Sequence, residues 1–172
     1  MSYALAVAIS TTEQRASYQN IMHMDIDPCR HMPRTHLWDV SLRQPIILYA
    51  EGNSILRRFL TDVFDLAGWH AHEAFSVGTT ESLLCSAQRF SLLLTADELP
   101  PLNLLPGRSG LELVTFARGL EHRKDMPILF VSIEDCAERA LAAGANAFLR
   151  KPHDMFLLVD TIRRLLAEAG EK

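Results

Sequence analysis

The stretch Phe90-Ser91-Leu92-Leu93-Leu94-Thr95-Ala96-Asp97-Glu98-Leu99-Pro100 decides the fold, because a short apolar run ends abruptly in two carboxylates and a proline. An apolar run of this length predicts a strand that is buried on both faces and runs into a loop. In sheets built from such strands, the loops at the strand ends carry the ligand site. Ala96 and Asp97 are therefore the first residues to consider as part of a functional site.

From Pro45 onward, short apolar runs of this kind alternate with stripes of apolar residues at helical spacing. The expected strands are Pro45–Ala50, Trp69–Ala74, Phe90–Thr95, Pro127–Ser132 and Ala145–Arg150. The expected helices run from the cap Asn53 to Gly68, over Thr80–Gln88, through Leu113–Leu120, over Asp135–Ala143 and onward from the cap Asp154. This alternation predicts an α/β fold with a five-stranded parallel sheet, doubly wound and covered by helices on both faces.

Residues 1–44 lack this regular pattern and are expected to form an N-terminal extension, whereas residues 45–172 form the folded domain. The capping-box pattern Ser10-Thr11-Thr12-Glu13 predicts a short helix from about Thr11 to Met22. Prolines and mixed polar residues follow it without sustained periodicity. The extension is therefore expected to be partly helical or disordered.

The composition excludes several classes of function. A net charge of −4 and an isoelectric point near 6.0 leave no basic stripe for the phosphates of a nucleic acid. No apolar run approaches the roughly 18 residues of a membrane-spanning helix, and Tyr3–Ile9 lacks the basic leading region of a signal peptide. The three scattered cysteines fit reduced thiols, so the expected location is the cytoplasm.

The residues just beyond the predicted strands form the candidate site. Because ligands of open parallel sheets bind beyond the carboxyl ends of the strands, the residues to consider are Glu51-Gly52, Ala96-Asp97, Ser132 and Lys151. A Lys-Pro pair directly after a strand favours a pocket position for Lys151 over an ordinary surface position. Glu51 fits two roles equally well, as an ion partner of Lys151 and as a metal ligand.

Over Pro45 to Leu166, the chain resembles the receiver domain of two-component response regulators. The segments that carry the resemblance stand in the family's order: Ile47–Asn53 with Leu56–Arg58, Pro106–Leu113, Ser132, Ala143–Ala145 and Phe148–Pro152. The second segment looks like the family's Pro-Gly-x-x-Gly-Leu-Glu loop. The resemblance implies the flavodoxin-like receiver fold and a role in phosphorelay signal transduction.

The family's chemistry uses an aspartate at the end of the third strand to accept a phosphoryl group, and two further acids that help it hold Mg²⁺. By the resemblance, Glu51 matches the first of these acids. Ser132 matches a hydroxyl, and Lys151 an ammonium, that contact phosphoryl oxygens. Phe148 matches an aromatic residue that moves with the switch, and the Lys151–Pro152 peptide bond is expected to be cis.

Two positions depart from the family's pattern. Gly52 replaces the second acid, so Mg²⁺ binding through Glu51 is expected to be weak or absent. Ala96 stands at the acceptor position, and alanine accepts no phosphoryl group. Asp97 is the alternative acceptor, because Asp97 to Pro101 repeats the family's spacing from acceptor to proline. Since side chains alternate along a strand, Asp97 is expected to point away from the pocket unless a bulge turns it back.

These features predict a stand-alone receiver-like protein that acts in two-component signalling as a phosphorylation-independent interaction module. It is expected to be no enzyme beyond autocatalytic phosphoacceptance, and to bind no cofactor. The expected partners are a histidine kinase, a phosphotransfer protein or another regulator, and a homodimer stays open. Two alternatives remain at this point. One is a Mg²⁺-dependent receiver phosphorylated on Asp97, and the other is a non-covalent anion or small-ligand sensor that uses Lys151 and Ser132.

Overall fold

The computed structural model describes residues 44–100 and 109–170, which lie in a compact unit spanning Leu42–Lys172. The predicted N-terminal extension lies outside the described residues, as do Pro101 and the Pro106–Arg108 part of the predicted loop. The described residues contain five strands, β1 (Ile46–Ala50), β2 (His70–Ala74), β3 (Leu92–Ala96), β4 (Ile128–Ser132) and β5 (Ala147–Arg150).

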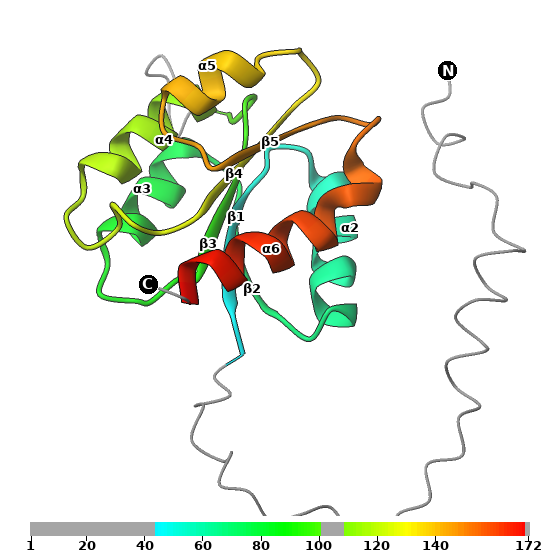
Figure 1. The fold of residues 1–172 in the computed structure, drawn as a ribbon, viewed down its shortest axis with the longest axis horizontal. Coiled ribbons are helices and arrows are strands. Elements are labelled where there is room, and N and C mark those ends of the chain that lie inside the picture. Colours follow the sequence, from blue (N-terminus) through cyan, green and yellow to red (C-terminus); the bar gives the residue numbers. More distant parts are fainter. Residues whose placement is uncertain (1–43, 101–108, 171–172) are drawn as a thin grey trace, which may run out of the picture. The chain divides into compact units, whose positions relative to one another are not determined.

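The strands form one parallel sheet in the order β2-β1-β3-β4-β5. The helices are α2 (Ser54–Leu66), α3 (Val77–Cys85), α4 (Gly110–Gly119), α5 (Ala137–Ala142), the 3-10 turn η1 (Met155–Leu157) and α6 (Leu158–Gly170). Figure 1 shows α2 and α6 on one face of the sheet and α3, α4 and α5 on the other. The predicted fold class, a doubly wound five-stranded parallel sheet, is confirmed.

The core lies on both faces of the central strands, because β1, β3 and β4 carry apolar side chains at nearly every position. Every residue of β3 and of β4 is buried, as the unbroken apolar runs predicted. The edge strand β2 differs, since His70 and Glu73 are exposed. Its mixed sequence fits a strand at the edge of the sheet.

Local capping explains where the helices begin. Asn53 caps α2 as predicted, and its side chain accepts hydrogen bonds from the backbone N–H groups of Ile55 and Leu56. The predicted start of the next helix at Thr80 is wrong, because Ser76 and Thr79 form a reciprocal capping box that begins α3 at Val77.

The predicted cap Asp154 is also wrong. Its carboxylate accepts a hydrogen bond from the backbone N–H of Arg150, at 2.9 Å, rather than from the helix. One 3-10 turn, Met155–Leu157, therefore precedes α6.

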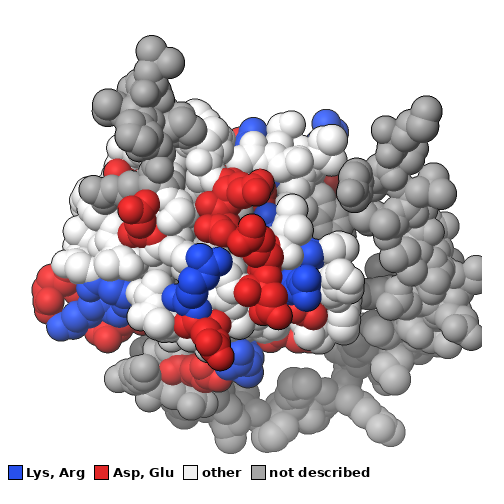
Figure 2. All heavy atoms as spheres, turned by 90° about the horizontal axis from the view of Figure 1, so that it is seen from above, with Lys and Arg blue, Asp and Glu red and all other residues white. Residues whose placement is uncertain are grey.

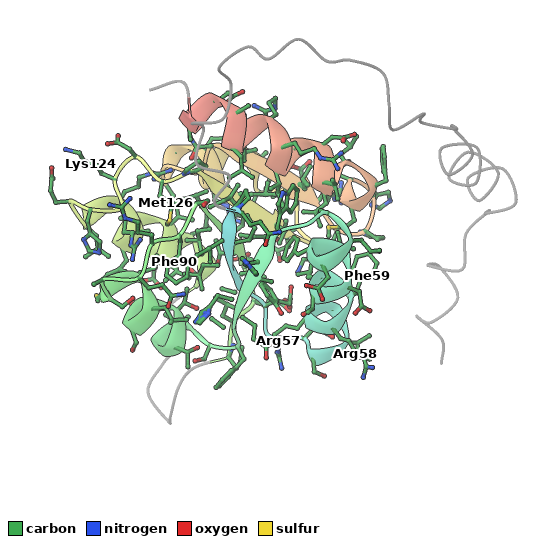
Figure 3. The ribbon with its side chains drawn as sticks, turned by 90° about the horizontal axis from the view of Figure 1, so that it is seen from below. Arg57, Arg58, Phe59, Phe90, Lys124 and Met126 are labelled. Carbon is green, nitrogen blue, oxygen red and sulfur yellow. The ribbon has the colours of Figure 1, made fainter. Side chains whose placement is uncertain are left out.

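Two arginines close the edge of the sheet at which the strands begin. Arg123 is buried against the ring of Phe90 and donates to the carbonyl oxygens of Leu84 and Ser86. Arg118 donates to the carbonyl oxygens of Gly144, Lys124 and Met126; Figure 3 labels Phe90, Lys124 and Met126 at this edge. Burial lowers the pKa of both guanidinium groups, and each stays charged because carbonyl dipoles surround it.

The first turn of α4 lies directly against the end of β3. The backbone N–H of Gly110 donates to the carbonyl oxygen of Asp97 at 3.0 Å. A Cβ atom at Gly110 would lie 2.0 Å from the carbonyl oxygen of Ala96. Glycine is required there because the obstructing atoms belong to the backbone. This contact fixes the path of the chain where β3 ends.

We expect Gly110→Ala to lower the free energy of unfolding by about 3 kcal/mol, because backbone atoms of β3 and α4 must separate. The matched control is Gly119→Ala at the other end of the same helix, where an added Cβ would meet nothing within 4 Å. The control is expected to be neutral or to stabilise by about 0.5 kcal/mol. Urea unfolding of both variants tests this, and equal effects would contradict it.

Candidate functional site

A cavity of about 670 Å³ lies at the edge of the sheet where the strands end. Its lining residues come from the ends of β1, β3, β4 and β5 and from the loops that follow: Glu51, Gly52, Asn53, Leu56, Asp97, Glu98, Leu99, Pro100, Ser109, Ser132, Ile133, Glu134 and Lys151. The structure thus brings together five of the predicted site residues: Glu51, Gly52, Asp97, Ser132 and Lys151. Ala96 and Phe148 do not line the cavity.

The strongest interaction in the cavity joins Lys151 to Glu51. The Lys151 Nζ lies 2.6 Å from Glu51 Oε2, and these side chains are only 15% and 4% exposed. The other carboxylate oxygen, Oε1, accepts from the backbone N–H of Asn53 at 2.9 Å. The ammonium and the carboxylate neutralise each other in a place where either charge alone would be poorly solvated. The Lys151–Pro152 peptide bond is cis, as expected.

Ser132 is the last residue of β4, and Phe148 lies within β5. Ser132 is buried, and its Oγ accepts from the backbone N–H of Glu134 at 3.1 Å. The half-buried ring of Phe148 stacks on Phe130, with ring centroids 6.4 Å apart and an angle of 21° between the planes. Phe148 therefore packs against the sheet, and its contact with the core is with β4.

Ala96 ends β3 as a buried residue, 1% exposed and paired with Val131. The β3–β4 register is regular from Leu93 to Ala96 and contains no bulge. Asp97 extends the ladder by one hydrogen bond, from its N–H to the carbonyl oxygen of Val131, and then the chain leaves the sheet. Asp97 is half-buried and lines the cavity, which differs from the expectation based on alternation, because regular strand geometry stops at Ala96.

The space beside Gly52 is filled by the loop that follows β3. A Cβ atom at Gly52 would lie 2.8 Å from Cδ of Pro100 and 3.0 Å from the carbonyl oxygen of Glu98. A carboxylate at position 52 would therefore require that this loop move away from β1. The absence of the second acid and the course of the loop are parts of one packing arrangement.

These residues do not fit the Mg²⁺ site of receiver domains. Both oxygens of Glu51 already have partners in Lys151 and Asn53, and Gly52 has no side chain. Ala96 has no side-chain oxygen, which leaves Asp97 as the carboxylate at the end of β3. Among residues 44–100 and 109–170, no group of three or more His, Cys, Asp or Glu side chains is arranged to hold a metal ion. Hard divalent cations need several oxygen ligands together.

Among the described residues that line the cavity, carboxylates outnumber cationic side chains. The charges of Lys151 and Glu51 cancel, and three further carboxylates belong to Asp97, Glu98 and Glu134, of which Glu134 lies 3.6 Å from Arg139. Figure 2, which looks onto this edge of the sheet, shows Asp and Glu side chains gathered over the middle of the face. An anion entering the cavity would meet net repulsion.

Tyr49 and Arg57 support the site from the side of β2, and sequence reasoning gave neither of them a role. Arg57 donates to the carbonyl oxygens of Glu51 and Gly52 at 2.9 and 2.8 Å, which holds the turn after β1. The Tyr49 hydroxyl bonds to Thr61 at 2.7 Å and lies 3.1 Å from Glu73. Burial raises the pKa of Tyr49; the Thr61 bond opposes this shift and the Glu73 carboxylate adds to it.

Comparison with known proteins gives consistent results. No family model matches the sequence. The chain is 26% identical over 122 residues to the chemotaxis protein CheY of Pseudomonas aeruginosa, an alignment that covers 69% of this chain and 94% of the relative. A CheY-like response regulator receiver domain protein from Methanospirillum hungatei has a similar structure, with a TM-score of 0.65, 22% identity and coverage of 74% of this chain and 98% of that one.

The receiver domain of a sensor histidine kinase from Pseudomonas aeruginosa, solved with a magnesium ion coordinated in its active-site cleft, gives a TM-score of 0.62 at 20% identity. That alignment covers 72% of this chain and 98% of the other. The described domain therefore has the receiver fold. The resemblance to the receiver family of two-component response regulators, predicted from the motifs, is confirmed. Within the part of the chain that the structure describes, no helix is both long and apolar enough to span a bilayer.

We expect Lys151→Met to lower the free energy of unfolding by about 3 kcal/mol, because it leaves the Glu51 carboxylate buried without its partner. Adding Glu51→Gln in the same chain should recover about half of this loss, so that the two effects are not additive. Urea unfolding of the single and double variants measures the coupling.

The matched control is the exposed pair Arg164–Glu168, which is also close, at 2.7 Å, but has both side chains more than half exposed. The same cycle of Met and Gln substitutions there should give a coupling below about 0.5 kcal/mol. Equal coupling in the two pairs would mean that the Lys151–Glu51 contact is no stronger than a surface ion pair.

Proposed function

We propose that this chain is a receiver-like protein of two-component signalling that works without being phosphorylated, as a protein-interaction module. The proposal rests on Ala96, a buried residue at the end of β3, which the alignment predicted from the sequence puts at the family's phosphoacceptor position. A methyl group has no lone pair to attack phosphorus, so the usual transfer has no nucleophile at this position.

The surroundings of Ala96 support the same conclusion. In an active receiver, the ammonium at the end of the fifth strand serves the phosphoryl group, whereas Lys151 is paired with Glu51 at 2.6 Å. The space that a side chain at position 52 would need is filled by the loop at Pro100. Loss of the nucleophile, loss of the metal ligands and capture of the ammonium all remove parts of one reaction.

A receiver phosphorylated on Asp97 is the second candidate, and one observation favours it: Asp97 lines the same cavity as Lys151 and Ser132. Two observations weigh against it. Within the described residues, the ion pair of Lys151 is with Glu51 and not with Asp97. In addition, the carboxylates of Glu98 and Glu134 beside Asp97 oppose the approach of a phosphoryl donor.

The anion sensor is disfavoured by the same charges. Among the described lining residues Lys151 is the cation, and an anion would have to compete with Glu51 for it while facing Asp97, Glu98 and Glu134. We therefore propose no resident cofactor and no ligand for this site.

The function that remains is recognition of another protein. The proposed partners are a histidine kinase, a phosphotransfer protein or another regulator, in the cytoplasm, and the proposed docking face is the one formed by α5, β5 and α6. Ile133 and Leu141 lie before and within α5 and are 64% and 51% exposed, which offers apolar contact area there. Without a covalent switch, partner binding alone would select between conformations.

The test is incubation of the full chain with acetyl phosphate and Mg²⁺, followed by intact-mass measurement under conditions that preserve acyl phosphates. We expect no gain of a phosphoryl group by the wild type or by Asp97→Asn, because neither presents an acceptor with its metal. A receiver domain with an intact acceptor, treated in parallel, shows that the donor is active.

A labile adduct on the wild type that disappears in Asp97→Asn would overturn the proposal and establish Asp97 as a working acceptor. A companion measurement is thermal unfolding with and without millimolar Mg²⁺, for which no shift is expected. Stabilisation by Mg²⁺ that Glu51→Gln abolishes would contradict the account of the metal position.

A further inference from the structure

Helix α2 carries an apolar stripe on the side that faces away from the sheet. Ile55, Phe59 and Leu66 are 81%, 40% and 90% exposed, although three apolar side chains on one helix face are normally buried. They recur at intervals of four and seven residues, so they share one side of the helix. The opposite side of the helix buries Leu60 and Phe64 in the core.

Charged residues border the stripe in an ordered way. Arg58 lies near the start of the helix, and Asp62 and Asp65 lie towards its end; all three are exposed. Arg58 and Asp65 are seven residues apart, so they lie on the same flank of the stripe, about 10 Å apart along the axis. None of the ion pairs found among the described residues uses any of these three side chains. Figure 3 shows Arg58 and Phe59 on the outer side of α2, and Arg57 turned towards the sheet.

We propose that this surface, the α2 stripe, binds the α2 stripe of a second copy of the chain in an antiparallel arrangement. A two-fold axis that crosses the helix near its middle places Ile55 of one copy against Leu66 of the other. The same operation brings Arg58 of each copy beside Asp65 of the other. Two such pairs form, because the two-fold axis places the charged flank of one helix next to the same flank of its partner. The stripe is therefore complementary to itself in its apolar residues and in the Arg58–Asp65 pair, whereas Asp62, near the axis, faces Asp62 of the second copy and weakens the contact.

The α2 stripe is a small surface. A contact made by one helix is smaller than a standard interface, so the dimer is expected to be weak and to depend on concentration. This assembly does not depend on the proposed function, since neither the cavity nor Ala96 takes part in it.

The test is sedimentation velocity of the full chain from about 5 to 500 µM, a range that brackets a weak association. We expect a reversible monomer–dimer equilibrium and a dissociation constant that rises at least tenfold in Leu66→Ser. The matched control is Leu141→Ser, which removes another exposed leucine, from α5, and should leave the constant unchanged. Dimers weakened by Leu141→Ser but not by Leu66→Ser would overturn the proposal in favour of the α5 face.

A charge exchange tests the antiparallel pairing itself. Arg58→Asp and Asp65→Arg should each weaken the dimer about threefold to tenfold, because each places like charges opposite one another. The double variant exchanges the charges on both copies and should return the dissociation constant to within about twofold of the wild type. Circular dichroism confirms that each variant is folded. A chain that is monomeric throughout the range, or a double variant no tighter than the singles, would overturn the proposal.

Discussion

The ion pair between Lys151 and Glu51 governs the carboxyl edge of the sheet. It joins the end of β5 to the turn after β1, and the strands β3 and β4 lie between them. A buried ammonium needs a counter-charge, and Glu51 supplies it, although Asp97 at the end of β3 lines the same cavity. The retention of both charges is therefore explained by their need for each other, without any reference to a metal or a phosphoryl group.

The steric arrangement of the same edge follows from two glycines. At Gly110 the chain of α4 approaches the last carbonyl group of β3 so closely that no Cβ fits. At Gly52 the loop after β3 occupies the space that a second acid would need. Together they draw the loop towards β1 and over the cavity. Pro100 thus packs into the space that a side chain at position 52 would occupy. The glycine at position 52 and the position of Pro100 therefore depend on each other.

The fold could be predicted from the sequence because local patterns determine it. The unbroken apolar runs of β3 and β4 belong to strands covered on both faces, and Asn53 marks the start of a helix by its side chain alone. The errors arose where two local solutions compete. In the capping box that Ser76 begins, the third helical position is Thr79, whereas the usual pattern has Glu or Gln there. The Asp154 side chain bonds back to the backbone of Arg150 instead of capping the helix.

The site was predictable only as a set of positions. The residues at the strand ends do meet around one cavity, as parallel topology requires. Their pairing was not predictable, because Lys151 and Glu51 are 100 residues apart and nothing local indicates which carboxylate the lysine meets. The position of Asp97 was not predictable either, since alternation holds only while a strand continues, and β3 stops one residue earlier.

Charge connects these features to function. A receiver that transfers phosphoryl groups must gather positive charge, from metal and lysine, where a dianion will sit. Among the described lining residues the balance differs, because Glu51 neutralises Lys151, Arg139 lies 3.6 Å from Glu134, and the carboxylates of Asp97 and Glu98 add negative charge. The proposed departure from the family's chemistry would therefore involve the whole cavity, and it leaves the surfaces outside the cavity as the proposed sites of partner recognition.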